Sequence, residues 1–172
     1  MTIYLEDALL KQLADESKAQ ALDLVNLRIH KATPEGLDKI FNRIRALGLE
    51  KRIQKLDLSN NQLRTLPERL FRGLETLQLL DLKNNQLSTL PEGLFQGLTA
   101  FWLDLSHNQL TDLPERLFRD LVTLQLLCLH DNQLSTLPAG LFQGLETLQR
   151  LYLSENQLID LPAGIFNNLN LN

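Results

Sequence analysis

The sequence predicts an α/β solenoid, a stack of short coils that each add one strand to a curved parallel sheet on the concave side. The convex side should be irregular or made of short helical turns. The stretch TLQLLDLKNNQLSTLPEGLFQGL, residues 76–98, recurs in close copies on either side of itself. Its leucines follow the pattern LxxLxLxxNxL, and the fixed asparagines are 24, 23, 24 and 24 residues apart, at Asn61, Asn85, Asn108, Asn132 and Asn156. A period between about 20 and 29 residues with this leucine spacing is typical of coils that bury their apolar faces only by stacking.

Each repeat contains one short strand. In LLDL, Leu80 and Leu82 are two residues apart, so their side chains point to the same side of a strand, toward the interior. Leu79, Asp81 and Lys83 point to the opposite, concave face. The alternation predicts one face that holds the coils together and one that is free to meet another molecule.

A turn and a return segment follow each strand. Asn85 comes at the turn, where a carboxamide can donate to and accept from backbone groups that have left the ladder. Pro91 removes a backbone donor, which favours a loop or a single helical turn over a second strand. The inward apolar residues of the return are Leu87, Leu90, Leu94, Phe95 and Leu98.

Composition limits the classes of partner and compartment. The net charge of -4 and the pI of about 5.4 argue against a nucleic-acid binder, which normally carries a basic face. Cys128 is the only cysteine, so the chain forms no internal disulfide and a reducing compartment is favoured. The first residues carry acids within their apolar pattern, unlike a secretory signal, and no run reaches the roughly 18 apolar residues of a membrane span. These features predict a cytoplasmic protein with no membrane partner and no cofactor.

Residues 1–52 are predicted to form a helical N-terminal cap with one degenerate strand. Residues 5–16 suit an amphipathic helix, with an apolar stripe of Leu5, Ala8, Leu9 and Leu13. Residues 21–29 suit a first strand, with Leu22 and Leu24 in the inward positions, Leu27 in place of the asparagine and Ile29 at the next leucine position. A second helix should begin at Thr33 and Pro34 and end at Gly48, burying Leu37, Ile40, Phe41, Ile44 and Leu47. The alternative is that this segment forms a separate small domain.

Five repeats occupy residues 53–172 and should form one continuous domain with the cap. They begin at Ile53, Leu77, about Ala100, Leu124 and Leu148. The third is one residue short, which should tighten or bulge the return at residues 99–101. The last ends without a recognisable cap, so its exposed strand edge is expected to be covered by a continuation of the chain, another copy or a partner.

These units resemble the typical, 24-residue class of leucine-rich repeat found in receptor ectodomains, over residues 53–169. The resemblance implies a parallel sheet that lines a concave protein-binding surface. The cysteine-rich caps of secreted members are missing here. Repeats without cysteine-rich caps are also similar to leucine-rich-repeat effectors of intracellular bacterial pathogens such as Legionella, which would be delivered into a host cytosol. The shorter repeat of the ubiquitin-ligase effectors is absent here.

The concave face can be read as columns across the strands. The first outward position carries Ala21, Lys55, Leu79, Trp102, Leu126 and Arg150, and the second carries Asp23, Asp57, Asp81, Asp104, Cys128 and Tyr152. The third carries Val25, Ser59, Lys83, Ser106, His130 and Ser154, and the fourth carries Asn26, Asn60, Asn84, His107, Asp131 and Glu155. With strands about 4.8 Å apart, Leu79, Trp102 and Leu126 should form one apolar ridge, which Tyr152 extends diagonally. A tryptophan flanked by leucines and rimmed by charge is the composition of a binding hot spot.

Two features of this face have alternative interpretations. Trp102 could turn inward because of the neighbouring deletion and fill the core. Asp57, Asp81 and Asp104 should repel each other by somewhat under about 1 kcal/mol per pair, a strain that a basic partner would relieve, but they could also serve only solubility.

An internal comparison concentrates variation on the same face. Residues 76–91 and 123–138 are identical except at three outward positions, where Asp81, Lys83 and Asn84 become Cys128, His130 and Asp131. Cys128 and His130, with Asp104 and His107 on the next strand, could suggest a thiol with a base or a metal cluster. Spacing alone gives neither an oxyanion site and pocket nor a closed tetrahedral arrangement, so we predict no catalytic, cofactor or metal site.

The sequence therefore predicts a non-enzymatic protein-interaction module. The apolar ridge and Tyr152 would bind a protein, and Asp57, Asp81, Asp104 and Asp131 would steer a basic surface toward it. Lys83, His107, Cys128 and His130 complete the predicted binding residues. Inhibition of a partner enzyme or effector by occlusion is the predicted mode of action. The alternative is a structural scaffold or the recognition fragment of a longer receptor, and an enzyme built on Cys128 and His130 is a third hypothesis.

Overall fold

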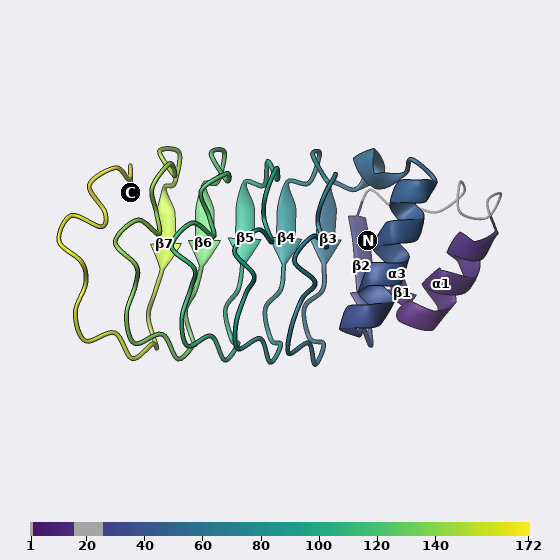
Figure 1. Ribbon diagram of the computed structural model, residues 1–172, viewed down its shortest axis with the longest axis horizontal. Coiled ribbons are helices and arrows are strands. Elements are labelled where there is room, and N and C mark those ends of the chain that lie inside the picture. Colours follow the sequence, from purple (N-terminus) through teal and green to yellow (C-terminus); the bar gives the residue numbers. More distant parts are fainter. Residues whose placement is uncertain (1, 16–25) are drawn as a thin grey trace.

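A computed structural model describes residues 2–15 and 26–172 of the chain. The described N-terminal elements are β1 (Thr2–Leu5), α1 (Glu6–Ala14), β2 (Asn26–His30), α3 (Pro34–Ala46) and the 3₁₀ turn η1 (Glu50–Arg52). Five three-residue strands follow, β3 (Lys55–Asp57), β4 (Leu79–Asp81), β5 (Trp102–Asp104), β6 (Leu126–Cys128) and β7 (Arg150–Tyr152). Figure 1 shows these strands side by side along an elongated molecule, with α1 and α3 at one end.

All described strands belong to one seven-stranded sheet, paired in parallel in the order β1 to β7. The return segments of the coils contain successive turns rather than helices, for example Leu70 N to Pro67 O at 3.0 Å and Leu74 N to Phe71 O at 3.2 Å. Each coil thus supplies one strand and one irregular return. This confirms the predicted α/β solenoid and its irregular opposite side.

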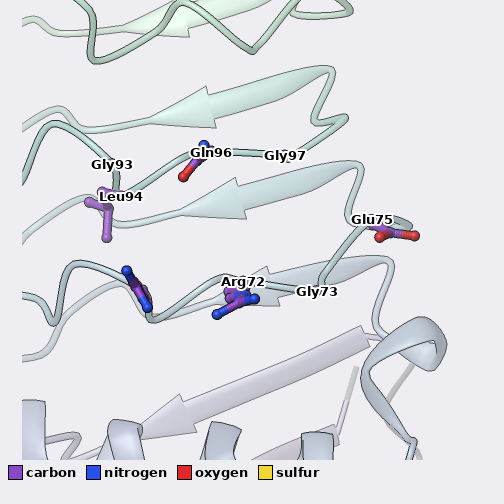
Figure 2. Close-up of a pocket in the computed structure, with 8 residues that line it drawn as sticks. Arg72, Gly73, Glu75, Gly93, Leu94, Gln96 and Gly97 are labelled. Carbon is purple, nitrogen blue, oxygen red and sulfur yellow. The ribbon is translucent and has the colours of Figure 1, made fainter.

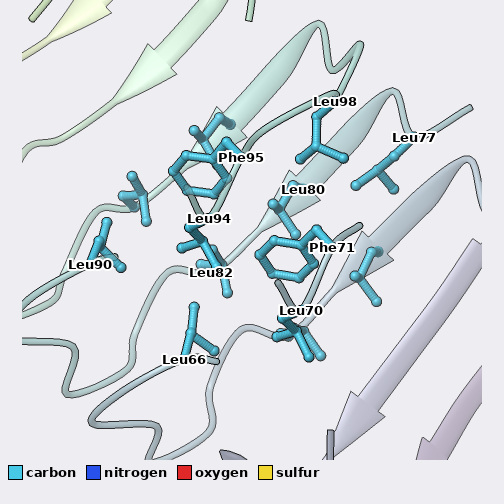
Figure 3. Close-up of a cluster of buried hydrophobic side chains, with 14 of the residues drawn as sticks. Leu66, Leu70, Phe71, Leu77, Leu80, Leu82, Leu90, Leu94, Phe95 and Leu98 are labelled. Atoms are coloured by element: carbon cyan, nitrogen blue, oxygen red, sulfur yellow. The ribbon is translucent and has the colours of Figure 1, made fainter. Parts of the chain in front are cut away.

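The predicted alternation of the strands is confirmed by burial. Leu80 and Leu82 are fully buried, whereas Leu79, the first residue of β4, is only half-buried. In β6, Leu127 is fully buried and its neighbour Leu126 is half-buried. Figure 3 shows how the inward leucines of one coil lie against those of the next, so the core is a continuous stack of apolar layers.

The fixed asparagines tie adjacent coils together. The Asn85 Nδ2 group donates to Leu82 O in its own coil and to Leu58 O in the preceding coil, both at 3.0 Å. Its Oδ1 accepts from Leu63 N of the preceding coil at 3.1 Å. Asn61, Asn108, Asn132 and Asn156 repeat the pattern. Each carboxamide therefore satisfies backbone groups that the short strands leave unpaired.

A line of phenylalanine rings runs through the return segments and into the cap. Phe71 and Phe95 stack with centroids 6.2 Å apart, and Phe95 and Phe118 stack at 6.1 Å. Phe41 of α3 meets Phe71 edge to face at 6.4 Å. The cap helix thus contributes to the same core as the repeats.

The second cap helix begins as predicted. The Thr33 hydroxyl accepts from Gly36 N at 3.0 Å, and α3 ends just before Gly48, whose φ of 65° suits glycine. The Glu6 carboxylate at the start of α1 also accepts from the Thr33 backbone N–H at 2.5 Å. A Cβ at Gly36 would lie 1.9 Å from the Glu6 carboxyl carbon, so glycine allows this close approach of the two helices.

The first cap helix is shorter than predicted, because a strand precedes it. Residues 2–5 form β1, which pairs in parallel with β2, and α1 runs only from Glu6 to Ala14. Leu9 and Leu13 are buried as expected, but Leu5 is 49% exposed and Ala8 is exposed. The predicted stripe therefore narrows to the residues that face α3.

The predicted register of the first repeat-like strand is wrong. Leu27 pairs with Leu56 and Arg28 with Asp57, so Leu27 takes the first inward position and Ile29 the second. The Asn61 carboxamide fixes this register, since its Nδ2 donates to Ile29 O at 3.0 Å and its Oδ1 accepts from Ala32 N at 2.8 Å. Residues 21–25, which carry the predicted Ala21, Leu22, Asp23, Leu24 and Val25 positions, lie outside the described residues.

The short third repeat keeps its strand in register and absorbs the deletion in its return. Leu79 pairs with Trp102, and Ala100 occupies the buried position that Leu77 fills one coil earlier. Leu77 N donates a hydrogen bond to Leu74 O at 3.0 Å. Among the described residues, Ala100 N makes no equivalent turn bond in the third repeat. Phe101 is left 43% exposed. The missing residue thus changes the return before the strand, where we predicted a tightening or a bulge, without displacing β5.

The layer of the fifth repeat is less enclosed than the others. Leu151, Leu153, Leu158, Phe166 and Leu169 are only partly buried. Ile159 is 87% exposed and Leu161 is 46% exposed. The expectation of uncovered apolar residues beside β7 is therefore confirmed.

Candidate functional site

The outward side chains of β3 to β7, with the turn residues that follow each strand, form one surface, which we call the outer sheet face. Its first column joins Lys55, Leu79, Trp102, Leu126 and Arg150, which are paired across adjacent strands. The two end residues are exposed and the three in the middle are half-buried. The apolar ridge of Leu79, Trp102 and Leu126 is therefore continuous and accessible.

Trp102 points away from the core. It is half-buried, whereas its neighbour Leu103 in β5 is 1% exposed. Trp102 pairs with Leu126 of the next strand, and its indole N–H interacts with the neighbouring Cys128 thiol. Burial raises the pKa of that thiol, and this interaction acts to lower it. The alternative in which Trp102 fills the core is wrong, because the deletion is absorbed before the strand.

The side chains of the second column are much less exposed than we predicted from the sequence. Asp57, Asp81, Asp104 and Cys128 are only 6–9% exposed, and Tyr152, at 45%, is the exception. The predicted exposed acidic stack is therefore wrong: these carboxylates present little surface to a partner.

The aspartates of this column hold the turns. Asp57 Oδ1 accepts from Ser59 N at 2.9 Å and from the Ser59 hydroxyl at 2.6 Å. Asp104 Oδ1 binds Ser106 in the same way, at 2.9 Å and 2.5 Å. These serines are buried as well, contrary to their predicted outward placement.

Asp81 is the least compensated of the three. Its Oδ1 accepts from Lys83 N at 3.0 Å, but no serine hydroxyl is available at position 83. Burial, with a smaller contribution from the charges of Asp57 and Asp104, raises the pKa of Asp81 from 3.8 to about 6, although the hydrogen bond from the Lys83 N–H acts to lower it. The expected mutual repulsion of the column is therefore concentrated on its middle member.

Arg28 is a residue of this face that the sequence analysis missed. Its Nε is 3.2 Å from Asp57 Oδ2, so it neutralises the first aspartate of the column. The predicted register assigned Asp23 to this position. The signal that could have revealed it is the Leu-Arg-Ile run at residues 27–29, which matches the alternation of a strand.

Cys128 is a poor nucleophile in this setting. Burial raises the pKa of its thiol from 9.0 to about 11, and Asp104 adds to the rise. The thiolate is the reactive form of cysteine, so this environment opposes thiol chemistry.

The remaining predicted residues lie in the turns after the strands. Lys83 and His130 occupy the third column and are half-buried, while His107 and Asp131 occupy the fourth, exposed and half-buried respectively. The fourth column has left-handed backbone throughout, with φ between 52° and 56° at Asn60, Asn84, His107, Asp131 and Glu155. His130 packs edge to face with Tyr152, with centroids 6.2 Å apart, which links the turn to the open end of the face.

The pockets found among the described residues lie elsewhere, along the return segments and at the N-terminal cap. Figure 2 shows one of about 420 Å³, lined by Arg69, Arg72, Gly73, Glu75, Gly93, Leu94, Gln96 and Gly97. None of the predicted binding residues lines it. The outer sheet face is thus an extended surface of the kind used for macromolecules, in contrast to the concave, enclosed pockets that hold small ligands.

Among residues 2–15 and 26–172, no helix has the length and apolar character needed to cross a bilayer.

The comparison with protein families identifies the class. The leucine-rich repeat model matches residues 51–110 and 101–158. The chain belongs to the leucine-rich repeat family. Among curated protein sequences, none matches it.

A solved structure extends the similarity to the cap. A chain in the structure of the Toll–Spatzle complex, a molecular hub in Drosophila development and innate immunity, is similar with a TM-score of 0.71 and 29% sequence identity. The alignment covers 90% of the present chain, which spans 20% of the length of that one.

Proposed function

We propose that this chain is a non-enzymatic protein-interaction module that binds a protein on its outer sheet face. The observation that carries the proposal is the apolar ridge, three large side chains held outward across adjacent strands. The similarity to a chain from a complex between Toll and Spatzle supports a role in protein recognition. The geometry suits it because the strands are held by inter-coil hydrogen bonds and lose little freedom on docking.

Trp102 is the proposed centre of the binding surface. It is half-buried and flanked by Leu79 and Leu126 on the neighbouring strands, so a partner would bury an aromatic side chain that the sheet already holds in place. Such buried aromatics dominate binding free energy at interfaces. The exposed part of Tyr152 would extend the contact toward the end of the sheet.

The charge of the face favours a partner with a basic surface. The protein carries a net charge of -4, and Asp131 and Glu155 stand at the rim of the face. Because Asp57, Asp81 and Asp104 are enclosed, we assign them a contribution to the field around the face rather than direct contacts. Rim charges act mainly on the association rate.

The test is a pull-down from a lysate of the source cells with the immobilised chain, compared across three variants. Trp102→Arg and Leu126→Glu each place a charge on the ridge. Gln96→Arg places the same positive charge as Trp102→Arg on an exposed position of the return side. Specific partners should be lost with the two ridge variants and retained with Gln96→Arg, at unchanged melting temperatures. Equal retention by all three would show that the ridge is not the binding surface.

The mode of action we propose is occlusion of a partner enzyme or effector in the cytoplasm. A second candidate is the recognition part of a longer receptor, favoured by the finding that the chain spans 20% of the Toll-complex chain it resembles. An occluding protein should lower the activity of a captured partner when added alone, whereas a receptor segment should bind without changing it. Cell fractionation with an antibody against the chain measures the location.

A further inference from the structure

Three side chains with metal-binding atoms meet at the turns after β5 and β6. One donor atom each from His107, His130 and Asp131 lies within 4.8 Å of the other two. His107 Nδ1 is 3.6 Å and His130 Nε2 is 3.9 Å from Asp131 Oδ2. The two imidazole rings meet edge to face with centroids 5.3 Å apart. From the sequence we predicted no metal site, because spacing alone showed no closed tetrahedral arrangement of ligands.

The backbone of these turns is fixed by the stack. His107 N donates to His130 O at 3.1 Å, and Asp131 N donates to Ser154 O of the next coil at 3.1 Å. His107 and Asp131 both have a φ of 53°, a left-handed conformation that histidine and aspartate adopt more readily than most residues. The donors are therefore presented from rigid positions on adjacent coils.

The protein does not use these donor atoms for its own hydrogen bonds. Both distances to Asp131 exceed the usual hydrogen-bond range of roughly 2.7–3.2 Å. The Nδ1 atom of His130 is buried and has no hydrogen-bond partner among the described residues. This nitrogen is not the one that faces Asp131, so Nε2 is the atom of His130 that is placed to bind an ion.

The internal repeat shows which residues the site adds. Residues 76–91 are identical to residues 123–138 except at three positions, and two of the three differences create His130 and Asp131 from Lys83 and Asn84. His107 occupies a column that holds asparagine at positions 60 and 84. The first two repeats, which we call the sister repeats, therefore hold the same turn without metal-binding side chains at these positions.

We propose that His107, His130 and Asp131 bind a divalent transition-metal ion, with Zn²⁺ as the best match to two imidazoles and one carboxylate. In a tetrahedral Zn²⁺ site with bonds of about 2.0–2.1 Å, donor atoms are about 3.4 Å apart, so the three side chains close by about 1 Å on binding. The exposed ring of His107 has room for this rotation. Three protein donors leave a coordination position open toward solvent on the outer sheet face. The site lies on the same outer sheet face as the proposed protein-binding ridge, but it is inferred without relying on that function.

The experiment is isothermal titration of the untagged, metal-free full chain with ZnCl₂. One ion should bind per chain, and His107→Asn and the pair His130→Lys with Asp131→Asn should each weaken binding at least about tenfold, as loss of a ligand requires. The substituted residues are those of the sister repeats, so the fold should be kept, which circular dichroism melting checks. His30→Ser is the matched control. His30 is the only other histidine of the chain, and it lies in the third column, like His130, beside Lys31.

A second measurement locates the ion. Long-range ¹H–¹⁵N spectra should show Zn²⁺ shifting the ring nitrogens of His107 and His130 but not those of His30. No binding up to 1 mM ZnCl₂ would overturn the proposal. Binding that is equally strong in His107→Asn and in the double variant would also overturn it, whatever the outcome of the pull-down.

Discussion

Replacing Asp81 by asparagine is expected to stabilise the protein at neutral pH. Its carboxylate is buried between Asp57 and Asp104, and its pKa is raised from 3.8 to about 6. The asparagine Oδ1 can still accept from Lys83 N, while its amide can donate to the flanking carboxylates. The substitution thus removes a buried charge and keeps the hydrogen bond that holds the turn.

The magnitude follows from the pKa. The difference between 3.8 and about 6 corresponds to about 3 kcal/mol, an upper bound for the gain above pH 6. Because the folded-state pKa lies above the unfolded value, the folded protein binds more protons between about pH 4 and 6. The wild type therefore loses stability as pH rises through this window, and Asp81→Asn does not share that loss.

Urea unfolding of wild type and Asp81→Asn at pH 7.5 and pH 4.5 measures the effect. We expect Asp81→Asn to be about 1–3 kcal/mol more stable at pH 7.5, with a smaller gain at pH 4.5. Asp57→Asn is the matched control, because it breaks the 3.2 Å ion pair with Arg28 and should not stabilise. The reasoning would be refuted if Asp81→Asn were no more stable than the wild type at pH 7.5, or if its gain in unfolding free energy were the same at both pH values.

Three further predictions concern stability and reactivity. Asn108→Ala leaves buried backbone groups of two coils unpaired and should lower the free energy of unfolding by about 3–5 kcal/mol. Asn156→Ala removes the same kind of contact in the part-buried last layer and should lower the free energy of unfolding clearly less. Urea unfolding compares the two variants. Phe118→Ala interrupts the stacked rings and should lower it by about 3–5 kcal/mol in the same assay, and a loss below about 1 kcal/mol would contradict the packing argument. The Cys128 thiol, with its raised pKa of about 11, should react with Ellman's reagent at pH 8 at least about tenfold more slowly in the folded protein than in urea, and equal rates would show that it is accessible.

Much of the fold followed from local patterns. The period of 24 residues and the spacing of Leu80 and Leu82 predicted the coils, their parallel strands and the buried face, because strand geometry places alternate residues on opposite sides. Thr33 and Gly48 marked the ends of α3 through the chemistry of helix caps. The carboxamide of Asn85 was assigned to the turn for the hydrogen bonds it makes.

The errors arose where placement depends on neighbouring coils. Alternation says that Asp81 and Cys128 point outward, but not how far the assembled sheet encloses them, so their burial and raised pKa values were not visible in the sequence. The first strand was misplaced because its register is set by Asn61, about 30 residues further along, rather than by its own leucines.

The sequence by itself determined the repeat, the inward leucine layers, the asparagine ladder and the identity of the ridge residues, because each follows from the period of a strand or the chemistry of one side chain. The tertiary structure alone decided the depth of the second column, the pairing of Arg28 with Asp57, and the meeting of His107, His130 and Asp131. Those depend on how one coil is set against the next. That offset is fixed by hydrogen bonds and packing between coils, which no single repeat contains.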